Sequence, residues 1–220
     1  MRALSILEAR VLGVLVEKQH TVPDSYPLSL NALTLGCNQK TARDPVLNAS
    51  EAEVQATLDA LKSLSLVFEV SGSRVTRYEH NIGRVLGVPS QSVALLSVLA
   101  LRGPQTASEL RANCERLHRF ADVSSVEAFL DELAARPEDK GGPLALKLPR
   151  APGAREPRWT QLLTGAVDVA ALPVAAAGED FVAATEIAAL KAQQQSLRAE
   201  VEQLRSLVER LYAELGVSKG

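Results

Sequence analysis

Sulfur-containing and aromatic residues are scarce in this chain of 220 residues, which has two cysteines, one methionine and 4% aromatic residues. Two thiols as far apart as Cys37 and Cys114 provide neither a disulfide framework nor the four ligands of a zinc site. This use of cysteine is typical of a reducing compartment, so we expect a cytoplasmic protein.

Long apolar runs and an excess of either charge are also missing. Asp168 and Pro173 interrupt the most apolar stretch, 166–177, which is shorter than the ~20 residues of a membrane span. Glu8 and Arg10 interrupt the N-terminal apolar stretch, so it lacks the core of a secretory signal. The 24 basic and 26 acidic residues argue against binding nucleic acid through bulk positive charge. We expect no membrane contact, and any contact with nucleic acid must be local.

Catalytic and cofactor-binding motifs are absent from the sequence. The histidines His20, His80 and His118 stand apart from one another and from any cysteine or carboxylate at metal-ligand spacing. The chain has no P-loop, no G-x-S-x-G and no G-x-G-x-x-G motif. We therefore expect a protein that is not an enzyme and that uses no metal or other cofactor.

The first part of the chain has the periodicity of three helices. Two pairs of residues have the spacing of capping boxes and mark the starts of the first and third helices: Ser5 with Glu8, and Ser50 with Glu53. The second helix should stop around Asn38, because asparagine tolerates the left-handed conformation common at helix ends. Cys37 lies at an apolar-facing position of this second helix, and Cys114 lies at the corresponding position of a similar helix later in the chain. Both positions indicate small buried side chains.

An alternating pattern follows the third helix. It predicts strands at 66–70 and 74–78, joined by a tight turn at 71–73. Three helices followed by a hairpin are the winged variant of the helix-turn-helix. We therefore predict a mainly α fold with small β-hairpins, of class α+β.

The same order of elements recurs after a short joint that Gly83 and Gly87 bracket. Two further pairs have capping-box spacing: Thr106 with Glu109, and Ser124 with Glu127. A strand at 144–148 and a return strand around 158–160 would form a second hairpin. Because two copies of one pattern are stronger evidence than one, we predict tandem winged-helix domains.

The repeats divide the chain into four predicted parts. They are a first winged-helix domain at 1–85, a second at 86–165, a linker at 166–185 and a coiled-coil helix at 186–216. In the last part, steps of three and four form a heptad seam that favours a parallel homodimer. Its members are Ile187, Leu190, Gln194, Leu197, Val201, Leu204, Val208, Leu211 and Leu215. The alternative is that this helix folds back on its own winged domains.

The third helix of each copy, which enters the major groove in helix-turn-helix proteins, is acidic here. Carboxylates repel phosphates, so we expect the turns and hairpins to contact DNA instead. The candidate DNA-binding residues are Asn38, Gln39, Lys40, Thr41, Arg43, Arg74, Arg77, Lys147, Arg150, Arg155 and Arg158. The alternative is that these are solvated surface charges, and that Asn38 and Lys40 only cap a helix.

Several runs of residues resemble the YceH family of bacterial proteins. They are 7–13 (LEARVLG), 17–19 (EKQ), 26–31 (YPLSLN), 37–41 (CNQKT), 50–54 (SEAEV), 74–79 (RVTRYE) and 105–111 (QTASELR). The likeness spans nearly the whole chain and is weakest at 165–185. It implies a tandem winged-helix fold in a bacterial cytoplasm, and it defines no activity or binding residues that could be carried over.

Two functions follow from these features. The first is a non-enzymatic DNA-binding protein, similar to a transcription regulator, that dimerises through its C-terminal helix and binds double-stranded DNA. The second is a protein–protein interaction adaptor whose acidic third helices bind another protein. Winged-helix folds serve both uses, so the fold alone does not choose between them.

Overall fold

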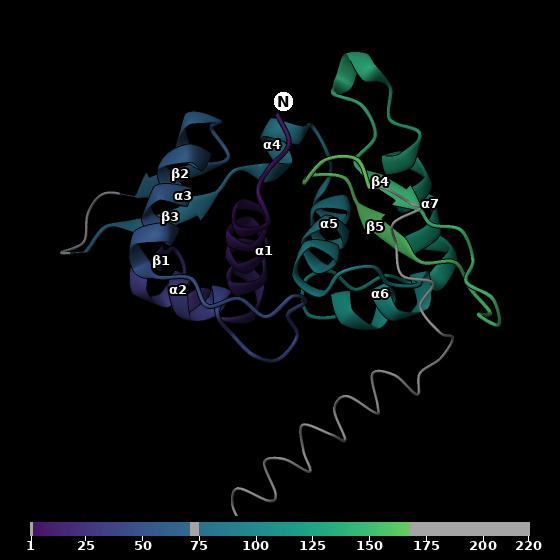
Figure 1. The fold of residues 1–220 in the computed structure, drawn as a ribbon, viewed down its shortest axis with the longest axis horizontal. Helices are drawn as coiled ribbons and strands as arrows, with labels where there is room; N and C mark the ends of the chain where they lie inside the picture. Colours follow the sequence, from purple (N-terminus) through teal and green to yellow (C-terminus); the bar gives the residue numbers. More distant parts are fainter. Residues whose placement is uncertain (1, 71–74, 168–220) are drawn as a thin grey trace, which may run out of the picture. The chain divides into compact units, whose positions relative to one another are not determined.

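The structure is a computed structural model that describes residues 2–70 and 75–167. These residues form a mainly helical fold with two small antiparallel sheets, which confirms the predicted α+β class (Figure 1). The helices are α1 (Ile6–Thr21), α2 (Leu30–Cys37), α3 (Glu51–Ser63), α4 (Ile82–Leu86), α5 (Ser90–Arg102), α6 (Ala107–Cys114) and α7 (Val123–Ala134), with 3-10 turns η1 (Pro23–Ser25) and η2 (Glu138–Lys140). The strands are β1 (Leu28–Ser29), β2 (Val67–Val70), β3 (Arg77–His80), β4 (Ala145–Lys147) and β5 (Trp159–Gln161).

All described residues except 151–154 belong to one compact unit. Residues 151–154 form a turn in which the Ala154 amide donates to the Ala151 carbonyl at 3.0 Å. Both repeats of the sequence contribute side chains to a single apolar core within the compact unit. The boundaries at 85 and 165 remain predictions.

Side-chain caps define most of the helix starts. Ser5 and Ser50 begin α1 and α3 as reciprocal capping boxes, and Thr106 begins α6 in the same way, as predicted. The box predicted at Ser124 is wrong, because Asp122 caps α7 instead. The Asp122 carboxylate accepts from the Ser125 amide at 2.7 Å and is a stronger, charged acceptor than a hydroxyl.

The first sheet has the strand order β1–β3–β2, and it differs in register from the prediction. Val67 pairs with His80 and Val70 with Arg77, so the return strand starts at Arg77 rather than at residue 74. Tyr78 explains the shift, because its ring is buried and its hydroxyl donates to Gln55 Oε1 at 3.1 Å. Strand β1 was not foreseen, since two residues are too few to show alternation.

The second sheet confirms the predicted second hairpin. Strands β4 and β5 are antiparallel, with Ala145 opposite Gln161 and Lys147 opposite Trp159. Trp159 is buried, and its backbone also exchanges two hydrogen bonds with Gln105, just before α6. This attachment fixes the hairpin to the second repeat.

The short joint between the repeats contains a helix that the sequence pattern did not indicate. Helix α4 occupies Ile82–Leu86, and Gly87 ends it with φ +63°, a left-handed conformation that glycine adopts without steric cost. Ile82 and Leu86 are both buried, so α4 adds to the common core.

The repeats meet where α1 and α5 lie side by side (Figure 1). A Cβ atom at Gly13 would lie 2.9 Å from Leu101 Cγ and 3.3 Å from the Ser97 carbonyl oxygen. These distances are too short for a side chain. Gly13 therefore permits the close approach of the two helices.

Substituting Gly13 by alanine should destabilise the protein. Alanine improves helix propensity by up to about 1 kcal/mol, but overlap with α5 costs about 1–3 kcal/mol, so we expect a net loss in the free energy of unfolding. Urea denaturation measures the difference. Gly83→Ala is the matched control, because its Cβ would meet atoms no closer than 3.4 Å. Equal effects of the two substitutions would contradict the close packing at Gly13.

The two cysteines are buried in the core, as predicted from their positions on α2 and α6. Burial raises the pKa of Cys37 and of Cys114 to about 12. Because the thiolate is the reactive form, only a fraction of about 10⁻⁴ of either group would be ionised at pH 8.

Both thiols should therefore be unreactive toward a thiol reagent in the folded protein. With Ellman's reagent at pH 8, we expect almost no release of chromophore over minutes, and two equivalents once urea unfolds the chain. A rapid reaction of one thiol in the folded protein would show that it is accessible.

Candidate nucleic-acid interface

The connection between α2 and α3 contains five of the predicted DNA-binding residues, and the first of them is held inside the fold. Asn38 follows α2 with φ −90°, so the predicted left-handed cap is wrong. Its side chain instead bridges to Ala49, donating to the carbonyl at 2.7 Å and accepting from the amide at 2.8 Å. These two bonds close the connection into a loop and occupy the Asn38 amide group.

Arg43 also faces the interior. Its side chain is fully buried and pairs with Glu17 of α1, with 2.6 Å between Nη2 and Oε2. The guanidinium donates further bonds to the carbonyls of Gly36 and Ala42. The structure therefore gives Arg43 a role inside the fold, where its charge is neutralised by Glu17 and shielded from solvent.

Arg10 of α1 completes this buried cluster. It is fully buried and donates to the carbonyls of Cys37 at 3.1 Å and Pro45 at 2.6 Å. Burial lowers the pKa of Arg10, and the positive charge of Arg43 lowers it further. Burial alone would raise the pKa of Glu17, but Arg43 and Lys18 outweigh that effect, and the pKa is lowered.

Sequence reasoning missed the roles of Arg10 and Glu17. The available signal was the position of Arg10, a charged residue inside an otherwise apolar stretch. A charge at such a position either lies on the polar face of the helix or is buried with partners, and here it is buried. We call Arg10, Glu17 and Arg43 the buried charge cluster.

The middle of the connection leaves two side chains accessible. Gln39 is half-buried, and its side-chain oxygen accepts from Lys18 at 3.5 Å and from Arg43 at 3.4 Å. Lys40 and Thr41 are exposed. Of the five residues predicted here, only these two present their side chains fully to solvent.

Among its described residues, the first hairpin contributes little free positive charge. Arg74 lies outside the described residues. Arg77 is half-buried, and its Nη1 donates to the carbonyls of Ser25 at 3.1 Å and Pro27 at 2.7 Å. Arg77 thus attaches β3 to the turn before β1.

The second hairpin is different, because its cations face solvent. Lys147, Arg150 and Arg155 are exposed. Lys147 Nζ lies 5.2 Å from the centroid of the Trp159 ring, while the guanidinium groups of Arg150 and Arg155 bond to no other residue in the described part of the chain. Arg158 pairs with Glu109, with both guanidinium–carboxylate distances 3.0 Å, so its charge is largely compensated.

The third helices have acidic outer faces, in agreement with the sequence. The exposed carboxylates on α3 belong to Glu51, Glu53 and Asp59, and those on α7 to Asp131 and Glu132. Lys62, the one lysine of α3, pairs with Asp59 at 2.8 Å and also with Glu69 of β2. Neither helix presents an unpaired cation to a phosphate group.

Residues 2–70 and 75–167 contain neither a cluster of metal ligands nor a membrane-spanning helix. No three histidine, cysteine or carboxylate side chains come together there as metal ligands would. None of the helices in the same ranges is long and apolar enough to cross a membrane. The nine residues predicted to mediate dimerisation, from Ile187 to Leu215, lie outside the described part of the chain.

The described residues thus define a mainly α protein with a basic hairpin and acidic helix faces. Residues 4–154 match a family model described as "Protein of unknown function, DUF480". The chain is 67% identical over 218 residues to a UPF0502 protein of Methylibium petroleiphilum, covering 99% of this chain and 92% of the relative. It is 64% identical over 219 residues to a UPF0502 protein of Burkholderia ambifaria, covering 99% and 91%. The chain belongs to this bacterial family, UPF0502 or YceH, which confirms the resemblance found in the sequence.

The buried charge cluster predicts that Arg43 supports the fold. Arg43→Met leaves the mostly buried Glu17 carboxylate without its main partner, and we expect the free energy of unfolding to fall by about 3 kcal/mol. Lys40→Met, three residues earlier and exposed, should change it by less than about 0.5 kcal/mol. Urea denaturation compares the two variants. Equal stabilities would mean that Arg43 is not the structural anchor.

Proposed function

We propose that this chain is a non-enzymatic DNA-binding protein built from two winged-helix modules, and that it binds duplex DNA through its second hairpin. The order α1, α2, α3, β2, β3 recurs as α5, α6, α7, β4, β5, and this repetition supports the two modules. The observation that carries the proposal is the exposure of Lys147, Arg150 and Arg155 on the β4–β5 hairpin.

Exposed cations favour DNA binding because each one that neutralises a phosphate releases condensed counterions. A hairpin carrying three of them can follow the phosphate backbone without reading bases, which gives sequence-independent binding. The acidic faces of α3 and α7 oppose insertion into the major groove. We therefore expect weak, strongly salt-dependent binding with little sequence preference.

Dimerisation would strengthen such binding. The heptad pattern at 186–216, which is a prediction from sequence, would bring two copies of the basic hairpin onto one duplex. The effective concentration of the second hairpin would then raise the overall affinity without any new kind of contact.

The salt dependence of binding tests the proposal. Fluorescence anisotropy of a labelled duplex of about 30 base pairs gives log K against log salt between about 50 and 200 mM, with a slope near −0.9 for each phosphate contact. Replacing Lys147, Arg150 and Arg155 together by glutamine should make the slope shallower by about 2.7 and weaken binding.

The control variant removes the same charge elsewhere. Arg84 of α4 and Arg116 and Arg119 of the connection between α6 and α7 are exposed arginines, and replacing them by glutamine should leave the slope within about 1 of the wild type. Equal slopes for the two triple variants would overturn the role of the hairpin. Absence of binding by the wild type at the lowest salt would overturn DNA binding itself.

A protein–protein adaptor is the second candidate, and a different observation favours it. The exposed faces of α3 and α7 carry carboxylates, which suit a partner with a basic surface rather than a nucleic acid. Failure of the wild-type protein to bind duplex DNA at low salt would favour the adaptor function over DNA binding.

A further inference from the structure

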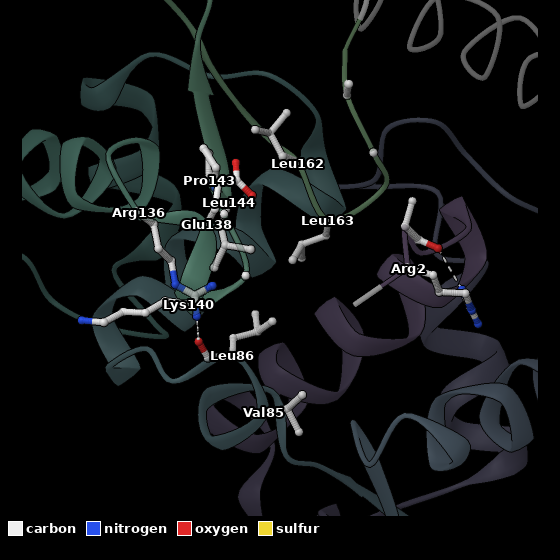
Figure 2. A pocket seen from close by; sticks show the side chains of 15 residues that line it. Arg2, Val85, Leu86, Arg136, Glu138, Lys140, Pro143, Leu144, Leu162 and Leu163 are labelled. Atoms are coloured by element: carbon white, nitrogen blue, oxygen red, sulfur yellow. Dashed lines mark hydrogen bonds between the residues drawn. The ribbon is translucent and has the colours of Figure 1, made fainter.

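A cavity of about 420 Å³ lies between residues 2–3, helix α4 and the open end of the β4–β5 hairpin, where β4 begins and β5 ends (Figure 2). Its apolar lining includes Val85 and Leu86 of α4, Leu144 before β4, and Leu162 and Leu163 after β5. Leu86, Leu144 and Leu163 are otherwise buried core residues, so the cavity reaches the edge of the hydrophobic core. It is therefore suited to an apolar molecular body.

Four charged residues also line the cavity, and three of them are cationic. They are Arg2, Arg136, Glu138 and Lys140. The Arg2 guanidinium donates to Glu8 at 2.8 Å, and this pair compensates its charge. Of the remaining three groups, Arg136 and Lys140 are positive and Glu138 is negative, so the lining carries one net positive charge.

Arg136 is the best placed of these cations. Figure 2 shows its guanidinium between the η2 turn and α4, where Nη2 donates to the Leu86 carbonyl. Nε and Nη1 make no hydrogen bond to another residue in the described part of the chain. A guanidinium fixed at one nitrogen, with further donors free, is suited to a carboxylate.

The other two charged groups limit what the cavity would accept. Lys140 is exposed at the rim and has no partner among the described residues, so it adds long-range attraction for an anion. Glu138 lies against Gly142, where a Cβ would come within 3.0 Å of Oε2. Its negative charge disfavours a ligand with several anionic groups.

We propose that this cavity binds a small amphiphilic monoanion, namely a carboxylate on an apolar aliphatic body. The carboxylate accepts hydrogen bonds from Arg136, and the body packs on Leu86, Leu162 and Leu163. This inference is independent of DNA binding, because no residue of the lining belongs to the proposed DNA contact.

Decanoate, used below its micellar concentration and in the absence of DNA, is the probe. Isothermal titration calorimetry of the full chain should show binding of one equivalent, while decyltrimethylammonium, which has an alkyl chain one carbon longer and the opposite charge, should bind at least about tenfold more weakly. Equal binding of the two amphiphiles would show that only apolar surface is involved and would overturn the proposal. Absence of decanoate binding would also overturn it.

Variants of the lining locate the site. Arg136→Gln should weaken decanoate binding by about tenfold or more and Lys140→Glu by a smaller factor, whereas Arg116→Gln, at an exposed position outside the cavity lining, should leave it unchanged. Lys140 is exposed, so its substitution keeps the test valid if Arg136→Gln fails to fold. Wild-type affinity in a folded Arg136→Gln, or in Lys140→Glu where Arg136→Gln does not fold, would place the ligand elsewhere and overturn the assignment.

Discussion

The buried charge cluster is the constraint that shapes the first repeat. The connection between α2 and α3 is long and irregular, and its carbonyl groups need donors once they are covered by the fold. Arg10 and Arg43 supply those donors, and Glu17 compensates the charge of Arg43. A neutral donor set could satisfy the same carbonyls, but two guanidiniums reach several of them at once from fixed positions. The connection is thereby attached to α1 instead of being free to follow a DNA backbone.

The second repeat shows what happens without that constraint. At the offset of 84 residues that aligns α1 with α5, Arg10 corresponds to Ala94 and Glu17 to Leu101, both buried and apolar. The connection between α6 and α7 is shorter, and the Cys114 carbonyl accepts from the amides of residues 117 and 118 within it. Because backbone bonds close this turn, no buried charge is needed. Leu101 is instead free to pack against Gly13 of α1, which joins the repeats.

Features with a local cause could be predicted from the sequence, and features with a tertiary cause could not. The capping boxes at Ser5, Ser50 and Thr106 depend on residues three apart, and the second hairpin depends on alternation, so both were found. The register of β3 depends on burying Tyr78 against α3, which no local pattern encodes. The same limit applies to the candidate site. Composition identified the cations, but only the tertiary structure separates Arg43, which is neutralised inside the fold, from Arg150 and Arg155, which face solvent.

The β4–β5 hairpin connects the two proposed surfaces. Its exposed cations lie toward the loop that joins the strands, whereas Leu144, Leu162 and Leu163 at its open end line the cavity. Trp159 anchors the hairpin between these ends through its burial and its backbone bonds to Gln105. A ligand in the cavity could change DNA binding only if it bound one orientation of the hairpin more tightly than another. A ligand with equal affinity for both orientations would not change their populations. The anchor at Trp159 opposes such a reorientation, so the structure favours two surfaces that act independently on one rigid element.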